Sequence, residues 1–189
     1  MINKYQSIIA WLVLAFAISS CDYQEIGDSP DYPEQIIYMP AAYHNLFEIK
    51  KQPDRFGDTP TDGDKYRYKI EGDKFLVPLG VYRAGINHKG SFDIHIAVDN
   101  DTITNLISEG LDASILPLDT YTFPSEITMP DGESFSGFNL EIDLDYLQNS
   151  LVEKYALGIR IHSADRETNP DLEVTLIVIH TEAARPDPE

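Results

Sequence analysis

An alternation of apolar and polar residues dominates the second half of this chain. In residues 91–98 and 138–144 every second side chain is apolar, and the side chains between them are polar or small. Successive side chains of a β-strand point to opposite faces of a sheet, so this period of two indicates strands with one buried and one solvated face. The core is therefore expected to consist of strands rather than helices.

Five further apolar runs predict strands, at residues 35–39, 66–70, 75–82, 155–162 and 172–180. The Glu-Gly-Asp sequence at residues 71–73 favours a hairpin between the second and third of these runs. The segment from Val174 to Ile179 is apolar on both faces of the predicted strand. Such a pattern indicates a strand in the interior of a sheet.

Two short helices fit between the strands. In the first, Asp101 or Thr102 is expected to cap a turn that runs through Leu106 and Ile107 and stops at Gly110. In the second, Asp145 is expected to cap residues 146–149. Together the elements predict an all-β fold, an immunoglobulin-like antiparallel β-sandwich of about seven or eight strands with one or two short helices. We expect this sandwich to span residues 35–182 and a C-terminal tail to cover residues 183–189.

The N-terminus has the pattern of a bacterial lipoprotein signal. Lys4 precedes an apolar run at residues 8–18, which is shorter than the about 20 residues that a membrane-spanning helix needs. The run ends in Ile18-Ser-Ser-Cys21, a small-residue cleavage site followed by the only cysteine. We expect removal of residues 1–20 and lipidation of Cys21. The alternative is an unmodified thiol beside an ordinary secretory signal.

The segment that follows the cysteine is expected to be a flexible tether. Residues 21–34 are acidic, contain Pro30 and Pro33, and show no apolar period. The lipid would hold the protein on a membrane, outside the cytoplasm. Residues 52–64 are rich in proline and glycine, which predicts an exposed loop inside the domain.

The chain is strongly acidic, with 14 Lys and Arg against 32 Asp and Glu and a net charge of −18. Since Lys4 is the only charged side chain in residues 1–20, the processed chain has 13 basic and 32 acidic residues. Binding of nucleic acid needs a basic face that displaces counterions from phosphates, so nucleic acid is excluded as a partner. The lipid, and not charged side chains, is expected to contact the membrane.

The sequence contains no recognisable catalytic set, and we expect no enzyme activity and no catalytic residues. The segment from Gly132 to Gly137 contains two serines but does not have the G-x-S-x-G spacing of a nucleophile elbow. The five histidines show no HExxH spacing, and a zinc site is not expected.

Calcium is the one candidate cofactor, because hard oxygen ligands gather at two places in the chain. Asp99 and Asp101 flank an asparagine, and Glu141, Asp143 and Asp145 alternate along a predicted strand face. These five carboxylates are the candidate metal ligands. The alternative explanation is a solvated outer face of the sandwich, on which like charges are spread by water.

Three tyrosines near the 52–64 loop are candidate glycan-binding residues. Tyr66, Tyr68 and Tyr82 recur beside this loop, and aromatic faces combined with hydrogen-bonding groups are typical of sugar-binding sites. The alternative is half-buried packing at alternating strand positions.

Four segments of the chain carry a resemblance to a known family. They are Phe75-Leu-Val-Pro-Leu-Gly-Val81, Leu116-Pro117 before Tyr121, Ile127-Thr-Met-Pro-Asp-Gly-Glu-Ser134 and Lys154-Tyr-Ala-Leu-Gly-Ile159. They resemble the domain of unknown function at the N-terminus of Bacteroidota surface lipoproteins, including one group in which it precedes a family 18 endoglycosidase. The resemblance covers residues 35–181. One departure is Gly158, where relatives often have proline, and it predicts a looser strand entry.

The resemblance implies a role in glycan foraging, because many relatives are encoded in glycan-utilisation loci. It also implies an outer-membrane lipoprotein displayed at the cell surface, which the acidic residues after Cys21 fit. A periplasm-facing orientation is the alternative. The first hypothesis is a non-enzymatic lipoprotein that acts as an accessory or glycan-binding component of a polysaccharide-utilisation system, with a glycan or an outer-membrane uptake complex as partner. The second is a structural or protein-docking module of a surface assembly without sugar affinity.

Overall fold

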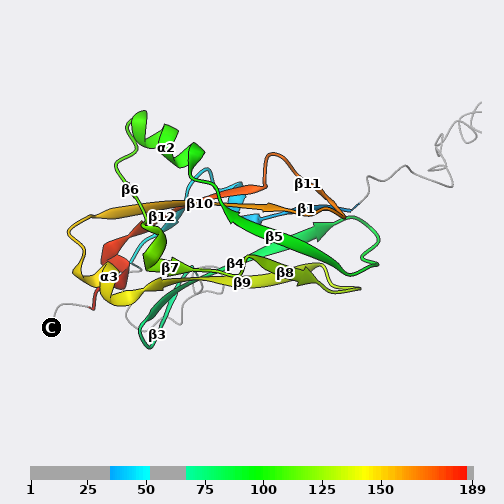
Figure 1. The fold of residues 1–189 in the computed structure, drawn as a ribbon, viewed down its shortest axis with the longest axis horizontal. Helices are drawn as coiled ribbons and strands as arrows, with labels where there is room; N and C mark the ends of the chain where they lie inside the picture. The colour runs from blue at the N-terminus through cyan, green and yellow to red at the C-terminus, as the bar shows by residue number, and fades with distance from the viewer. Residues whose placement is uncertain (1–34, 52–66, 187–189) are drawn as a thin grey trace, which may run out of the picture. The chain divides into compact units, whose positions relative to one another are not determined.

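The computed structural model describes residues 35–51 and 67–186. All described residues belong to one compact unit, which covers residues 33–189. In this unit two sheets of six strands enclose one hydrophobic core (Figure 1).

The first sheet, called sheet A, has the strand order β11-β1-β4-β9-β7, with β3 also paired to β4. Its strands are β1 (Ile36–Tyr38), β3 (Lys69–Glu71), β4 (Lys74–Ala84), β7 (Tyr121–Thr122), β9 (Phe135–Asp143) and β11 (Glu167–Thr168). The long β4–β9 pair forms the centre of sheet A, and it is antiparallel over nine residue pairs, from Lys74–Asp143 to Tyr82–Phe135.

The second sheet, called sheet B, has the strand order β2-β12-β10-β5-β8, with β6 also paired to β10. Its strands are β2 (Phe47–Ile49), β5 (Phe92–Val98), β6 (Ser114–Ile115), β8 (Glu126–Met129), β10 (Lys154–His162) and β12 (Val174–His180). As the apolar pattern predicts, β12 lies inside the sheet, between β2 and β10.

The core forms from the apolar positions that alternate along the long strands. Ile94 of β5, Leu140 of β9 and Ile159 of β10 are completely buried and belong to one cluster that both sheets share. Burial of these side chains removes apolar surface from water, which is the main favourable term in folding. The predicted all-β sandwich is confirmed, and the Glu71–Asp73 hairpin is also present, with Gly72 at φ +60° in the turn.

Short strands account for most of the difference between the expected and observed sheets. The described residues contain twelve strands, and six of these have only two or three residues. β1 and β3 lie in predicted apolar runs, whereas β2, β6, β7 and β11 pair in regions without any period-two pattern. Three of the pairings are parallel, namely β1–β11, β2–β12 and β6–β10. Two or three residues are too few for a periodic signal, so these pairings could not be read from the sequence.

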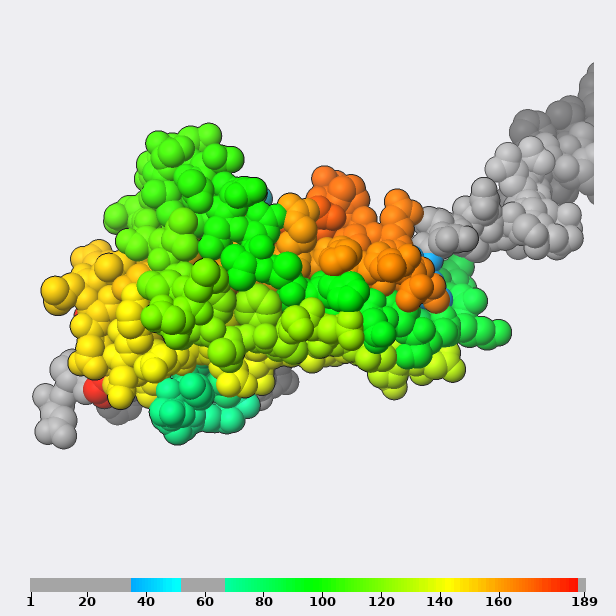
Figure 2. Space-filling model, in the orientation of Figure 1, coloured from blue at the N-terminus to red at the C-terminus, as the bar shows by residue number. Residues whose placement is uncertain are grey.

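Helix α2 (Asp101–Ser108) covers the outer face of sheet B. Its N-cap is Asn100 rather than the expected Asp101 or Thr102, and Asp101 is its first residue. Gly110, at φ +113°, follows its end as expected. Its Ile103 is completely buried and packs with Ala156 of β10 and Val178 of β12, which explains why β12 is apolar on both faces. The space-filling view shows this segment projecting from the sheet (Figure 2).

Helix α3 (Leu144–Asn149) begins earlier than expected. Its N-cap is Asp143 rather than Asp145, since the Asp143 carboxylate accepts a hydrogen bond of 2.9 Å from the backbone N–H of Tyr146. The strand β9 ends at Asp143, whose backbone (φ −59°, ψ 118°) is not helical, so the helix starts after it and Asp145 lies in the first turn. Three 3₁₀ helices complete the fold: η1 (Pro40–Tyr43), η2 (Leu118–Thr120) and η3 (Thr181–Ala184).

The folded domain extends slightly beyond the expected boundary at residue 182. Ala183 and Ala184 of η3 are buried in the core cluster, and the side-chain amide of Gln148 donates to the Ala184 carbonyl at 2.8 Å. No helix in the described part of the chain is long and apolar enough to cross a membrane.

Candidate functional site

Four aromatic rings form a row across sheet A, and we call Tyr38, Tyr43, Tyr82 and Phe135 the aromatic row. Tyr82 of β4 pairs directly with Tyr38 of β1 on one side and with Phe135 of β9 on the other. Directly opposed side chains on neighbouring strands lie on the same face of a sheet. The row therefore runs across the strands, and Tyr43 of η1 extends it beyond β1.

The rings follow one another at regular spacing. The Tyr38 and Tyr82 centroids lie 6.0 Å apart with planes 26° apart, and the Tyr82 and Phe135 centroids lie 4.9 Å apart. The Tyr43 ring meets the edge of the Tyr38 ring at 6.0 Å. Tyr43 is 68% exposed, Phe135 45% and Tyr82 39%. The row is thus a surface feature and not part of the core.

The alternation along β4 explains why the row faces outward. Val81 and Arg83 point into the sandwich and are buried, whereas Tyr82 between them points away. A pair of glycines next to the row, Gly80 and Gly137, makes room for the Phe135 ring. A Cβ at Gly80 would overlap this ring, and one at Gly137 would approach it to 3.2 Å. The ring therefore lies over the glycine backbone and leaves its other side open.

The buried guanidinium of Arg83 fixes the segments that carry the row. Arg83 is 2% exposed, and it donates hydrogen bonds to the carbonyls of Gly90 (2.8 Å), Pro130 (2.6 Å) and Glu133 (2.9 Å). Longer bonds reach Lys89 O (3.3 Å) and the Gln35 side-chain oxygen (3.4 Å).

These contacts join the segment before β1 to the turn before β9. Burial lowers the pKa of Arg83, and the positive charge of Arg166 lowers it further. The Phe92 ring packs against both guanidinium groups, with centroids 5.2 Å from Arg83 and 4.8 Å from Arg166. Since Arg83 follows Tyr82 on β4, one residue pair supplies both an exposed ring and the group that holds its neighbours in place.

The structure places the three predicted tyrosines at different kinds of position. Tyr82 is in the aromatic row, whereas the Tyr68 ring stacks on Phe75 at 4.8 Å and packs against the core. Tyr66 lies outside the described residues. Phe135 was not predicted as a site residue, although it occupies an outward position of an alternating strand, where a polar residue is the rule. That exception was the available signal in the sequence.

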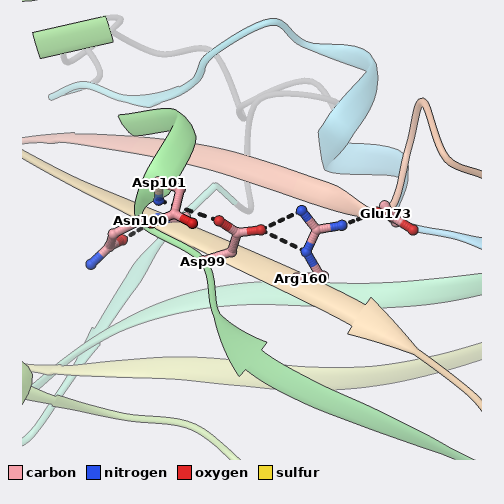
Figure 3. Close-up of polar contacts among 6 residues, drawn as sticks. Asp99, Asn100, Asp101, Arg160 and Glu173 are labelled. Atoms are coloured by element: carbon pink, nitrogen blue, oxygen red, sulfur yellow. Dashed lines mark hydrogen bonds and ion pairs between the residues drawn. The ribbon is translucent and has the colours of Figure 1, made fainter. Parts of the chain in front are cut away.

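The predicted calcium ligand Asp99 is bound to an arginine. Its carboxylate accepts a 2.6 Å hydrogen bond from Nε of Arg160 and contacts Nη2, and Nη1 of the same arginine contacts Glu173 (Figure 3). The backbone N–H of Asp101 donates to Asp99 at 3.3 Å. The positive charge of Arg160 thus takes the place that a cation would have.

Gly158 allows the same segment to cross closely over β10. The backbone N–H of Asp99 donates to the Gly158 carbonyl at 2.8 Å, and the Gly158 N–H donates to the side-chain oxygen of Asn100 at 2.9 Å. A Cβ at position 158 would overlap the Asp99 carbonyl oxygen. The expectation of a looser strand at Gly158 is therefore wrong, because this glycine permits a tight crossing.

The other predicted metal ligands do not converge. Asp143 caps α3, Asp145 is exposed in the first helical turn, and Glu141 stands at an outward position of β9. Within residues 35–51 and 67–186 no group of three or more His, Cys, Asp or Glu side chains is arranged to hold a metal ion. The structure does not gather the five predicted carboxylates into one site.

A chain of hydroxyl groups lies beneath α3. The hydroxyl of Tyr146 donates to that of Tyr155 at 2.7 Å, and Ser150 Oγ lies 3.0 Å from the Tyr155 hydroxyl. Burial, together with the bond to Tyr155, raises the pKa of Tyr146 to about 12. At neutral pH the Tyr146 phenol is therefore protonated and acts as a packing and hydrogen-bonding group.

Cys21, the predicted lipidation site, lies outside the described residues. A test of the lipid anchor therefore requires a measurement on the intact chain.

Comparisons with solved structures show a shared sandwich fold. A proposed carbohydrate binding protein from Bacteroides ovatus matches with a TM-score of 0.52 and 12% identity over 77% of this chain and 36% of that one. A two domain protein with unknown function from Bacteroides fragilis matches with a TM-score of 0.52 and 10% identity, over 77% of this chain and 45% of the other. An auxiliary nutrient binding protein from Bacteroides thetaiotaomicron gives a TM-score of 0.49 at 18% identity, over 73% and 44% of the two chains.

This chain spans less than half the length of each of these three proteins. At such low identity the two matches with a TM-score of 0.52 establish the fold alone. No curated protein matches the sequence significantly.

A family model covers most of the folded domain. The model, whose description reads "-like, N-terminal domain", matches residues 33–168 and includes the strands β1, β4 and β9 that carry the aromatic row. The match covers more than half of the chain and confirms the resemblance to a Bacteroidota domain of unknown function. The chain belongs to this family of N-terminal domains.

Proposed function

We propose that this chain is a non-enzymatic accessory lipoprotein of the outer membrane, displayed at the cell surface, that binds glycans for a polysaccharide-utilisation system. The single observation that carries the proposal is the aromatic row on the outer face of sheet A. Three of its four rings are between 39% and 68% exposed although they lie on regular structure or directly beside it. Single exposed apolar side chains are normal on a protein surface, but a contiguous group of them is typical of a binding site.

The chemistry of the row suits sugars. The faces of pyranose rings that carry C–H groups pack on aromatic rings, and the tyrosine hydroxyls can exchange hydrogen bonds with sugar hydroxyls. The rings are spaced 4.9 to 6.0 Å apart across three strands and η1, so successive sugars of one chain can contact different rings. We therefore expect affinity to rise with the length of the oligosaccharide.

The proposal is also supported by the lipoprotein signal at Cys21, by the glycan-foraging context that the family resemblance implies, and by the fold shared with a proposed carbohydrate binding protein. The proposed binding needs no metal, since the tyrosine rings and hydroxyls suffice for it.

The test is a glycan-array screen of the full-length protein in mild detergent, in parallel with the Tyr82→Ala variant. The proposal predicts a carbohydrate-specific signal that the substitution reduces. The Ile86→Ala variant is the matched control, because Ile86 is an exposed apolar residue outside the row. Silence of the folded wild-type protein across the array would contradict the proposal and favour a protein-docking module.

A further inference from the structure

We infer that the aromatic row accepts neutral glycans and rejects anionic ones, an inference that rests on the proposed function. The first observation is the lack of charge on the sheet face around the rings. β1, β4 and β9 place nine residues there, in the register that surrounds Tyr82. They are Ile36, Tyr38, Pro78, Gly80, Tyr82, Ala84, Phe135, Gly137 and Asn139, and none carries a charge.

Charged side chains return only toward the far end of the same strands. Lys74 pairs with Asp143, and Glu141 lies opposite Leu76. The whole chain has a net charge of −18, whereas these nine neighbouring positions carry no ionised side chain. Uronate or sulfate groups of a bound glycan would therefore meet no cation in this register of the sheet.

Two exposed carboxylates on segments beside the row oppose anions. Glu167 of β11 pairs with Ile36 of β1 and is exposed, and Glu133, two residues before Phe135, is also exposed. These two glutamates stand at opposite ends of the row. Their field adds to the negative potential of the whole chain, which lowers the local concentration of anionic ligands.

The arginine closest in sequence to the row cannot compensate for these carboxylates. Arg83 points into the sandwich, is 2% exposed and uses its N–H groups on backbone carbonyls. Arg166 donates to the Gln35 side chain at 2.9 Å and to the Asp165 carbonyl at 2.8 Å, and its guanidinium stacks on Phe92. Both cations are engaged in holding the loops together.

The test is affinity gel electrophoresis of the full-length protein in detergent, with neutral probes (galactomannan, β-glucan, xyloglucan) and anionic probes (polygalacturonate, alginate, chondroitin sulfate). We expect at least one neutral polysaccharide to retard the protein and the anionic ones to leave its mobility unchanged. Tyr82→Ala should weaken the neutral interaction about three- to ten-fold, and Ile86→Ala should not change it. Raising the salt to about 0.5 M should leave neutral binding within two-fold, since screening acts only on charges.

A charge-reversal variant tests the cause of the selectivity. Glu167→Lys should leave neutral binding within about two-fold and raise the binding of polygalacturonate, because it replaces a repulsive charge beside the row by an attractive one. Tyr82-dependent binding of an anionic polysaccharide to the wild-type protein, as tight as that of any neutral one, would overturn this inference and leave the proposed function intact. Failure of every polysaccharide to bind the folded protein would overturn both.

Discussion

Replacement of Arg83 by methionine should destabilise the domain more than any substitution of an exposed ion pair. The guanidinium is 2% exposed and donates to four backbone carbonyls and one side-chain oxygen. Its hydrogen bonds come from a buried cation whose acceptors are all uncharged. The Arg83→Met variant keeps most of the apolar stem but removes every donor.

The size of the effect follows from the acceptors that lose their partner. A buried carbonyl without a donor costs about 1–3 kcal/mol, although some of these loop carbonyls can be rehydrated, and removal of a buried cation also removes its desolvation cost. We expect a net loss of about 3–5 kcal/mol in the free energy of unfolding. For a domain of this size that corresponds to a Tm lower by about 6–20 °C. The free energy of unfolding of Arg83→Lys should lie between those of the wild type and Arg83→Met, because an ammonium keeps the charge but has only three donors.

The assay is urea unfolding followed by circular dichroism, with the free energy taken from the midpoint at constant m-value. Lys69→Met is the matched control, since Lys69 forms an exposed ion pair with Glu71 at 2.6 Å and should cost no more than about 1 kcal/mol. A count of ion pairs would rank Lys69 above Arg83. If the Arg83→Met variant unfolds within about 1 kcal/mol of the wild type at the same m-value, the proposed role of Arg83 is wrong.

Three further predictions concern the crossing over β10, the hydroxyl chain and the anchor. Gly158→Ala should lower the free energy of unfolding by about 3 kcal/mol or more, because the new Cβ would overlap the Asp99 backbone. Thermal unfolding should show a smaller loss of stability for Gly137→Ala, where only the Phe135 ring must shift. Equal losses in the two variants would refute this reasoning. The pKa of Tyr146 is raised to about 12 in the folded state, so its contribution to stability is complete below the ordinary pKa of about 10 and is lost as the pH rises through about 12. Urea midpoints should therefore fall less steeply across this pH range for Tyr146→Phe than for the wild type. An identical slope would contradict the assignment. Cys21→Ala should move the protein from the membrane fraction to the soluble fraction on an immunoblot of fractionated cells, and unchanged membrane retention would exclude the lipid anchor.

The predictable parts of the fold are those in which local sequence and burial agree. β5 and β9 each bury one face, so their alternation appears directly in the sequence. Helix α2 is followed by Gly110 at positive φ, and this stop signal is local. Its N-cap, Asn100, makes no side-chain capping hydrogen bond, so the start of the helix was predicted less well than its end. Strands such as β6 and β11 exist because another part of the fold lies beside them, and no pattern of two residues carries that information.

The candidate site shows the same division. Tyr82 was a candidate because it recurs with other tyrosines beside the 52–64 loop. Its grouping with Tyr38 and Phe135 could not be predicted, since it depends on the register of three strands that are far apart in sequence. For Asp99, the sequence shows a carboxylate beside other polar residues but cannot show that Arg160 binds it. Long-range pairing decides in both cases whether a side chain is available to a ligand.

The central claim is that the outer face of sheet A binds a glycan through the aromatic row. The most direct measurement is isothermal titration of the strongest array-selected oligosaccharide into the wild type, Tyr82→Ala and Ile86→Ala, all checked for folding. The account predicts measurable binding by the wild type and Ile86→Ala and an affinity about three- to ten-fold lower for Tyr82→Ala. Equal affinity of all three proteins would show that the sugar binds elsewhere and would contradict the account.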